Sequence, residues 1–452
     1  MATPFRRVLV ANRGEIAVRI IRACKELGLE SVQVYSEADR ESLPVRLAER
    51  ALCIGGARAS DSYLNAETIV SAARTQRADA IHPGYGFLSE NAEFATLCER
   101  EGIAFIGPSA DAIAQMGDKA AAKRIAREAD VPTVPGSDGA VRDAAEAEGI
   151  AARIGYPVLL KASAGGGGRG IRVVRNEKEL SNAYADATRE AKAAFGDGSM
   201  YLEKFLVDIR HVEVQVLSDG ENILHLGERD CSTQRRNQKL LEESPSPIVD
   251  EFMRADIGAA AIRLCRRVGY KNAGTVECIV DDASGSFYFM EMNTRVQVEH
   301  PVTEMVTGVD IVKEQIRIAE GRPLALRQSG IRLRGHAIEC RINAEDPDNG
   351  FAPCPGEVRH FHAPGGPGIR IDSHLYGGYR VPPYYDSLLA KLIAWGSDRN
   401  EAIARMQRAL DEMTIEGVKT TMLFHRKLLR DERFRNADIH TTFVEDEWRQ
   451  RP

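Results

Sequence analysis

Short apolar runs and helical repeats of apolar residues take turns along the first hundred residues of the chain. The runs have the length and character of buried parallel strands, and they lie at Arg7–Ala11, Ser31–Tyr35, Ala51–Ile54, Ala80–His82 and Ile103–Ile106. The segments between them carry helical patterns; in the first, Ile16, Ile20 and Ile21 share one face. This alternation predicts an open, Rossmann-like α/β domain, which we assign to residues 1–116. Its first turn lacks Gly-x-Gly-x-x-Gly, so the support for a dinucleotide site is weak.

The pattern changes after this domain. Val131–Gly139 is rich in turn-forming residues and predicts a hinge. The next segment, to about Tyr201, has the order helix, strand, glycine-rich loop, strand, helix. Beyond it we expect strands to dominate in Arg210–Met292, and a final α+β region to follow Arg332. A small unit beyond a Pro/Gly hinge indicates a lid, which we place at about residues 132–205.

Five of the six residues Gly165–Gly170 are glycines, in a loop between two apolar segments of β type, Tyr156–Lys161 and Ile171–Val174. Bare backbone N–H groups can curl around an anion, and Lys161 and Arg169 add positive charge. A P-loop differs, because it runs from a strand into a helix and ends in Gly-Lys-Ser/Thr. The pattern predicts a glycine-rich hairpin that closes over the polyphosphate of a nucleotide; the alternative is a flexible surface turn.

Two acidic residues face each other in a predicted hairpin. Its strands are Ala273–Val280 and Phe287–Met292. With the turn centred on Ser284, Glu277 and Glu291 lie opposite each other, where like charges repel. A divalent cation between them converts repulsion into binding; hard oxygen ligands suit Mg²⁺, and Asn293 adds one more on the same face. The alternative is a solvated sheet face that tolerates carboxylates.

The same polar face continues beyond the hairpin. In an extended chain Arg295, Gln297 and Glu299 fall on the side of Glu291 and Asn293, and this face is too polar for a core. It could bind a small anion through Arg295 and place a base, Glu299, beside it. The alternative is an exposed edge strand without chemistry.

Three further residues are candidates for anion binding. Lys239, in the cationic group Gln234–Lys239, could hold an oxyanion or lie in a solvated loop. Arg341 alternates with apolar residues in a predicted strand, so it is either in a buried ion pair or at an anion site. His211 could touch a phosphate, although a strand-surface histidine is the common case.

Bulk properties are those of a globular enzyme of two or three domains: 452 residues, 43% hydrophobic and 28% charged. The net charge of −6 argues against general affinity for nucleic acid or anionic membranes. The N-terminus has no signal-peptide pattern, and no stretch reaches the length of a membrane span. Eight dispersed cysteines without a Cys-x-x-Cys pair predict reduced thiols in a cytoplasmic protein rather than a zinc ribbon.

With these residues in view, the chain closely resembles biotin carboxylase, a member of the ATP-grasp superfamily, from end to end. Beside the glycine loop at Lys161, the motifs that carry the resemblance are Ala11–Ala17, His82–Glu90, Arg229–Ser232, Glu291–His300, Cys340–Asp346 and Pro382–Ser387. The length also matches the free-standing bacterial subunit. The resemblance implies a Rossmann-like N-terminal domain, an ATP-grasp domain at 117–325 with a mobile lid, and a C-terminal α+β domain at 332–445.

The resemblance also implies roles for residues, in the carboxylation of biotin that depends on MgATP (Mg²⁺ or Mn²⁺) and bicarbonate. Those that would bind ATP are Lys119, Lys161, Gly165, Gly166, Gly167, Gly168, Glu203, Lys204, Leu206, His211, Gln234, Asn237, Glu277 and Glu291. The metal would be held by Glu277, Glu291 and Asn293, and bicarbonate by Lys239, Arg295, Gln297 and the Val298 backbone. Glu299 would deprotonate bicarbonate, and Arg341 would stabilise the enolate-like biotin oxygen.

Two departures and one absence qualify the resemblance. Asn237 stands where many members have histidine, which bears on nucleotide affinity, and Ala164 replaces a glycine found at the start of the loop in some members. No Met-Lys-Met biotin attachment motif occurs, so we expect biotin to arrive on a separate carrier protein, with a separate carboxyltransferase. The family's habit suggests a homodimer.

The acceptor stays open at this point. The leading interpretation is the first half-reaction of acetyl-CoA carboxylase, which forms malonyl-CoA for fatty acid synthesis. The same half-reaction in another acyl-CoA carboxylase or a two-subunit pyruvate carboxylase is the nearest alternative. Another ATP-grasp ligase, which joins a carboxylate to an amine, is a second; a silent nucleotide-binding scaffold is a third, although it would need none of Lys239, Arg295, Glu299 and Arg341.

Overall fold

The computed structural model describes residues 4–162, 171–195, 198–282 and 284–448. The chain divides into two compact units. The larger consists of Met1–Val131, Arg210–Ile279 and Glu291–Pro452, and the smaller of Pro132–Ile209 and Val280–Met290. None of the helices in the described ranges combines the length and the apolar character that a membrane crossing needs.

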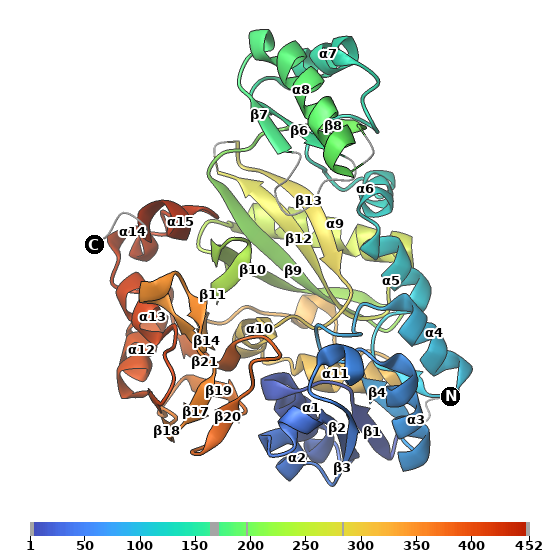
Figure 1. The fold of residues 1–452 in the computed structure, drawn as a ribbon, viewed down its shortest axis with the longest axis vertical. Helices are drawn as coiled ribbons and strands as arrows, with labels where there is room; N and C mark the ends of the chain where they lie inside the picture. The colour runs from blue at the N-terminus through green and yellow to red at the C-terminus, as the bar shows by residue number, and fades with distance from the viewer. Residues whose placement is uncertain (1–3, 163–170, 196–197, 283, 449–452) are drawn as a thin grey trace. The chain divides into compact units, whose positions relative to one another are not determined.

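The N-terminal part of the larger unit is a parallel sheet in the order β3-β2-β1-β4-β5, with helices packed on it (Figure 1). Its strands are β1 (Arg7–Val10), β2 (Glu30–Ser36), β3 (Arg50–Gly55), β4 (Ala80–His82) and β5 (Ala104–Phe105). Its helices are α1 (Gly14–Glu26), α2 (Leu43–Leu47), α3 (Ala66–Gln76), α4 (Ala92–Arg100), α5 (Ala110–Gly117) and α6 (Lys119–Glu128). The five predicted strands are confirmed, and α1 buries Ile16, Ile20 and Ile21 as its spacing predicts.

An eight-stranded sheet runs in the order β13-β12-β9-β10-β11-β14-β21-β19 (Figure 1). Its strands are β9 (Ile209–Ser218), β10 (Ile223–Arg235), β11 (Gln238–Ser244), β12 (Asn272–Asp281), β13 (Ser286–Asn293), β14 (His336–Asn343), β19 (Ile369–Ser373) and β21 (Leu388–Gly396). The pairs from β9 through β11, β14 and β21 to β19 are antiparallel. Strands far apart in sequence thereby become neighbours, which brings the side chains of β9, β11, β12 and β14 to one region.

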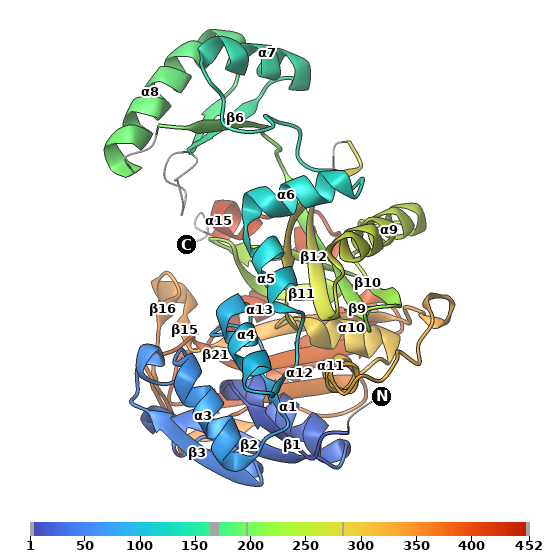
Figure 2. The ribbon, with the colours of Figure 1, turned by 90° about the vertical axis from the view of Figure 1, so that its right-hand side faces the viewer.

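Helix α9 (Glu251–Val268) lies within the segment where the sequence was expected to be mainly strands (Figure 2). Strands do dominate the segment as expected, with five strands around this one helix. The helix itself was not predicted, although both of its ends carry standard signals. Asp250 caps the first turn through the Met253 N–H, and Gly269 ends the helix in a left-handed conformation with φ 67°. Ile257, Ala261 and Leu264 are among the residues that it buries. Two shorter helices, α10 (His300–Thr307) and α11 (Ile311–Ala319), follow β13.

The C-terminal part packs helices on β14 and β21, as the expected α+β region would. Its other elements are β15 (Glu345–Asp346), β16 (Ala352–Pro353), β17 (Gly356–Val358), β18 (His360–His362), β20 (Tyr379–Val381), α12 (Arg399–Glu412), β22 (Thr414–Glu416), α13 (Met422–Leu428), α14 (Glu432–Arg435) and α15 (Phe443–Trp448). Ile338 and Leu392 from the strands join Ile403, Met406 and Phe424 from the helices in one buried cluster.

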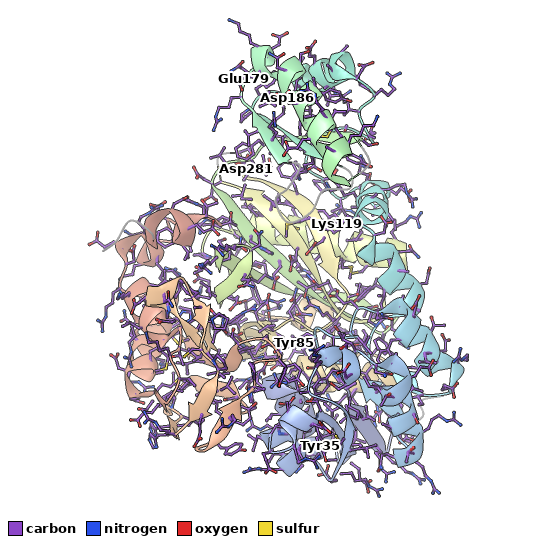
Figure 3. All side chains as sticks on the ribbon, in the orientation of Figure 1. Tyr35, Tyr85, Lys119, Glu179, Asp186 and Asp281 are labelled. Carbon is purple, nitrogen blue, oxygen red and sulfur yellow. The ribbon has the colours of Figure 1, made fainter. Side chains whose placement is uncertain are left out.

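The smaller unit is a three-stranded sheet covered by two helices; Glu179 and Asp186 mark α8 in Figure 3. Its elements are α7 (Ala144–Ile154), β6 (Val158–Ala162), β7 (Ile171–Val174), α8 (Glu177–Phe195) and β8 (Met200–Lys204). Strands β6 and β7 pair antiparallel, so the strand-to-strand setting of the glycine loop is confirmed. The predicted phosphate ligands Gly165, Gly166, Gly167 and Gly168 lie outside the described residues.

Candidate active site

The centre of the site is one lysine surrounded by three carboxylates. The Lys239 ammonium, on β11, donates to Glu213 Oε2 and Glu299 Oε1 at 2.6 Å each and to Glu277 Oε1 at 3.0 Å. Its side chain is only 12% exposed, so the solvated-loop alternative is wrong. The three carboxylates come from β9, β12 and the start of α10, three segments that only the folded sheet brings together.

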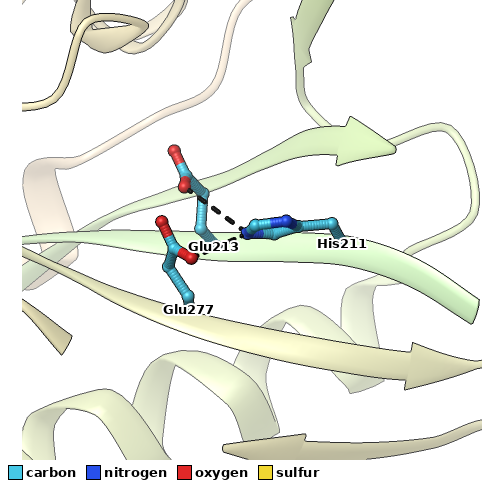
Figure 4. Close-up of side chains that lie close together, drawn as sticks. All are labelled: His211, Glu213 and Glu277. Atoms are coloured by element: carbon cyan, nitrogen blue, oxygen red, sulfur yellow. Dashed lines mark ion pairs between the residues drawn. The ribbon is translucent and has the colours of Figure 1, made fainter. Parts of the chain in front are cut away.

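Alternation on β9 explains two of the neighbours. His211 and Glu213 are two residues apart and point to the same side of the strand, where Glu277 approaches from the adjacent β12 (Figure 4). His211 Nε2 lies 3.0 Å from Glu277 Oε2 and 4.0 Å from Glu213 Oε2. The three could hold a metal ion by spacing. In this structure the ammonium of Lys239 already fills the space between the two carboxylates, so the cluster is explained by an ion-pair network.

The charges in this network set opposite pKa shifts. Burial works against the ammonium form of Lys239, but the charges of Glu213 and Glu299 outweigh it and raise its pKa well above the ordinary value. For Glu299, burial favours the neutral acid, yet Lys239 and Arg341 hold the pKa well below its usual range. Burial and the charge of Glu299 raise the pKa of Glu213. Glu299 is therefore a negatively charged carboxylate that accepts hydrogen bonds from two cations. A proton acceptor must be in this deprotonated state.

Arg341 connects this centre to a second buried acid. From β14 its Nη2 donates to Glu299 Oε2 at 2.9 Å and its Nε to Glu242 Oε1 at 2.5 Å. The ion-pair alternative is thus confirmed by geometry, while the pairing also leaves the guanidinium beside the proposed base. Glu242 sits next to Glu339 of β14 in the sheet register, and both glutamates are fully buried.

Burial raises the pKa of Glu242 to about 7, against the pull of Arg341. The native state then holds a proton that the unfolded chain releases near pH 4.5, so stability is lost as the pH rises from about 4.5 to 7. Glu242→Gln should remove that loss and stabilise the protein at pH 7 by up to about 3 kcal/mol, with little effect below pH 4.5. Urea unfolding across this pH range measures the difference.

The matched control is the next residue, Glu243, whose side chain points the other way. Burial there is outweighed by a hydrogen bond from His336 and the charge of Arg399, which lower the pKa to about 2. Its stabilisation is present above pH 4.5 and is lost as the pH falls towards 2, so Glu243→Gln should destabilise at pH 7. If Glu242→Gln also destabilised at pH 7, native Glu242 would be ionised.

Arg295 organises the segment after β13. Its guanidinium donates to Glu90 Oε2, Gln297 Oε1 and Asn293 Oδ1, each at 2.8 Å. The expectation of one continuous extended face was wrong, because β13 ends at Asn293 and residues 294–299 form bends and turns. Arg295 nevertheless contacts both Asn293 and Gln297, because its branched guanidinium group reaches the side chains on either side of it in the sequence.

Glu277 receives several donors at once. Its Oε1 accepts from Asn293 Nδ2 at 2.7 Å and Gln297 Nε2 at 3.0 Å, in addition to Lys239. Burial is outweighed by the charge of Lys239 and by His211, so the pKa of Glu277 is lowered and the group is charged. Strands β12 and β13 are hydrogen-bonded neighbours, which confirms the hairpin.

The donors predicted for a metal fit one chemically. Glu277, Glu291 and Asn293 supply hard oxygens, and Glu277 and Asn293 are in contact. Glu291 keeps 40% of its side chain exposed and lies 4.0 Å from Lys119 Nζ, at the start of α6 (Figure 3). The direct opposition of Glu277 and Glu291 stays a prediction.

The smaller unit holds the other predicted nucleotide residues. Lys161 on β6 forms an ion pair with Glu203 on the adjacent β8, and the two are cationic and anionic neighbours on one face of that sheet. Lys204 Nζ donates to the carbonyls of Gly155 and Tyr156, at 3.1 and 3.0 Å. Leu206 follows β8 and is half-buried. Their roles towards adenine and phosphate stay predictions.

The turn between β10 and β11 gives a physical reason for Asn237. Arg236 and Asn237 have φ values of 49° and 63°, a left-handed pair that joins the two strands of a hairpin. Asparagine tolerates this conformation better than most residues do. Asn237 is exposed, whereas Gln234 is 6% exposed and is the direct cross-strand partner of Lys239.

Several residues of the network were not predicted. Arg229 is fully buried and donates to Glu213 Oε1 at 2.6 Å, which holds that carboxylate towards Lys239. Glu90 holds Arg295, and Glu242 holds Arg341. The sequence did contain an indication of Glu213, because it lies two residues after His211 and therefore on the same face of β9. Glu90 belongs to the His82–Glu90 motif, but this motif does not indicate its partner, and no local pattern marks Glu242.

Comparison with known proteins decides the family. Residues 4–113 match the model of the biotin carboxylase N-terminal domain, 118–327 that of the carbamoyl-phosphate synthase L chain ATP-binding domain, and 339–446 that of the biotin carboxylase C-terminal domain. Biotin carboxylase 1 of Bacillus subtilis (strain 168) is 57% identical over 442 residues, which cover 98% of each chain. The chain belongs to the biotin carboxylase family.

Biotin carboxylases are ATP-grasp ligases that use MgATP and biotin, so the enzyme class of this chain is settled. A pyruvate carboxylase subunit from Methanothermobacter thermautotrophicus is 53% identical, over 99% of this chain and 90% of the relative. A biotin carboxylase domain dimer of 2-oxoglutarate carboxylase from Hydrogenobacter thermophilus, solved with MgADP, ADP and bicarbonate, superposes with a TM-score of 0.88 at 53% identity and covers 98% and 97% of the two chains. Biotin carboxylases that serve different acceptors are thus similar to this chain.

Proposed function

We propose that this enzyme carboxylates biotin on a separate carrier protein, with MgATP and bicarbonate as co-substrates and carboxyphosphate as the intermediate. The observation that carries the proposal is the arrangement around Glu299: one buried carboxylate between the Lys239 ammonium and the Arg341 guanidinium, at 2.6 and 2.9 Å. An anion can bind to the two cations while the carboxylate accepts a proton from it.

In the proposed first step Lys239, Arg295, Gln297 and the Val298 backbone hold bicarbonate, and Glu299 takes its proton. The oxygen of bicarbonate then attacks the γ-phosphate of ATP, which forms carboxyphosphate and releases ADP. Glu277, Glu291 and Asn293 would hold the metal ion, which would supply charge neutralisation at the phosphates. Lys119, Lys161 and the glycine loop are proposed as phosphate contacts, and Glu203, Lys204 and Leu206 as adenine contacts. His211 and Gln234 are proposed to contact other parts of the nucleotide.

In the proposed second step carboxyphosphate separates into CO₂ and phosphate. The phosphate takes the proton from the biotin ureido nitrogen, and that nitrogen attacks CO₂. Arg341 stabilises the enolate-like oxygen of biotin, as an oxyanion-hole donor does. Because carboxyphosphate hydrolyses readily, closure of the unit that contains Pro132–Ile209 has a purpose, which is to exclude water.

The test is ADP release with MgATP, with and without bicarbonate and free biotin. Stimulation that requires both additions supports the proposal. Nucleotide binding without any such stimulation would contradict it and would favour another ATP-grasp substrate.

A variant of Arg341 separates the two steps. Arg341→Ala should reduce biotin carboxylation by about 10²-fold, the effect of removing one oxyanion donor, and should reduce biotin-independent, bicarbonate-dependent ATP cleavage less. Both rates come from one preparation, by ¹⁴C-bicarbonate fixation and by ADP release. Equal losses in both assays would make Arg341 a structural partner of Glu242 and Glu299.

We propose that this half-reaction is the first half of acetyl-CoA carboxylase, which leads to malonyl-CoA and fatty acid synthesis. The proposed partners are a biotin carboxyl carrier protein and a carboxyltransferase. The proposed assembly is a homodimer, and the proposed location is the cytoplasm. The 57% identity to Biotin carboxylase 1 of Bacillus subtilis supports the biotin carboxylase half-reaction that this proposal shares with its alternatives. The Methanothermobacter thermautotrophicus relative, whose name places it in pyruvate carboxylase, supports the alternative. Reconstitution with candidate carboxyltransferases, with acetyl-CoA and pyruvate as acceptors, distinguishes the two.

A further inference from the structure

A second buried lysine, to which none of the roles above is assigned, contacts the backbone next to the proposed base. Lys391, on β21, has a fully buried side chain. Its ammonium donates to the carbonyl oxygen of Val298 at 2.8 Å. Burying an ammonium group costs free energy, because the charge loses its hydration. Partners of opposite charge must compensate for this loss.

The compensating charges are known and belong to different elements. Glu15 Oε1, in the first turn of α1, lies 3.1 Å from Lys391 Nζ, and Asp372 Oδ2, on the adjacent β19, lies 3.9 Å away. Asp372 has its own cation, Arg370, at 2.7 Å. Glu15 also accepts a hydrogen bond from the hydroxyl of Tyr85, the residue labelled in Figure 3. The N-terminal α/β part and the eight-stranded sheet therefore meet at Lys391.

The carbonyl that Lys391 holds belongs to the peptide group between Val298 and Glu299. Fixing its oxygen fixes the direction from which the Glu299 side chain leaves the backbone. The preceding peptide is held too, since His300 Nδ1 lies 2.7 Å from the Gln297 carbonyl oxygen. These contacts support a stretch without strand pairing, residues 294–299, that carries both Arg295 and Glu299.

We propose that Lys391 is the positioning residue of Glu299: through the Val298 carbonyl it holds the carboxylate in the place where bicarbonate gives up its proton. The inference rests on the proposed function, because it assigns Lys391 to the bicarbonate step. Lys391 touches no substrate in this role. Glu15 balances its charge and makes no contact with the carbonyl.

Two single variants separate positioning from charge balance. Lys391→Met removes the contact with Val298, whereas Glu15→Gln breaks the same ion pair and leaves that contact in place. We expect Lys391→Met to lower kcat for bicarbonate-dependent ADP release by about 10- to 100-fold, the effect of a small displacement of a reacting group. The KM for ATP should change by less than about twofold. Glu15→Gln should lower the thermal midpoint but keep kcat within about threefold.

The double variant Glu15→Gln/Lys391→Met covers the case in which Lys391→Met does not fold. Replacing both partners of a buried ion pair by neutral groups is tolerated far better than replacing one. Its kcat should stay low although its stability recovers. Equal kcat losses in the two single variants, or a double variant with wild-type kcat, would overturn the inference. A wild-type enzyme without bicarbonate- and biotin-dependent ADP release would overturn the proposed function itself.

Discussion

Replacing Glu299 by glutamine should lower bicarbonate-dependent ADP release by at least about 10²-fold, the usual contribution of a general base. The Glu299 side chain is fully buried, and Lys239 and Arg341 each donate to one of its oxygens. Glutamine keeps one oxygen acceptor but cannot take the proton of bicarbonate. MgATP affinity, measured by isothermal titration, should stay within about threefold.

Glu304→Gln is the matched control for this variant. Glu304 lies on α10, which begins directly after Glu299, is 7% exposed and also accepts from arginine, at 3.0 Å from Arg19 and 2.7 Å from Arg370. The donors to its carboxylate in the described residues are Arg19, Arg370 and the Ile311 N–H, whereas Lys239 donates to other carboxylates, so this variant should retain turnover. Unchanged turnover in Glu299→Gln would remove Glu299 from the role of base.

Lys239→Met should have the largest effect on stability. Glu213, Glu277 and Glu299 would lose their shared cation, and breaking a buried ion pair by removing one partner costs about 3–5 kcal/mol. Activity should be lost as well, since bicarbonate would meet a cluster of negative charge. Denaturant unfolding and the ADP assay measure the two effects.

The loss of stability should depend on pH with a definite sign. Lys239 lowers the pKa values of Glu277 and Glu299, so both rise in the variant. A carboxyl with a raised folded-state pKa keeps its stability below the unfolded value and loses it as the pH rises. The defect should therefore be smaller at pH 5 than at pH 8. A defect independent of pH would contradict the network.

Lys419→Met provides the comparison for a lysine–carboxylate pair at the surface. Lys419 pairs with Asp346 at 2.5 Å but keeps 64% of its side chain exposed. Solvent screens an exposed pair of this kind, so this variant should unfold almost as the wild type does. A large effect at Lys419 would mean that ion-pair geometry, rather than burial, sets the stability in this protein.

Local patterns were sufficient where the physics is local. The five N-terminal strands and α1 follow from apolar spacing, because their residues must bury one face against a neighbouring element. The strand-to-strand setting of the glycine loop followed in the same way. Helix α9 was missed although Asp250 and Gly269 cap it, because the strands around it dominated the interpretation of the segment.

The same distinction between local and long-range interactions holds for the site. Sequence motifs were enough to indicate the family and the candidates Lys239, Arg295, Glu299 and Arg341, because the motifs keep these residue types at fixed spacings. What each of them touches became visible only in the folded chain. Glu213, Glu242 and Lys391 enter the site through strand order and register, which pair residues from 26 to 99 positions apart. Electrostatic energy depends on distance in space, so no local pattern could reveal these partners.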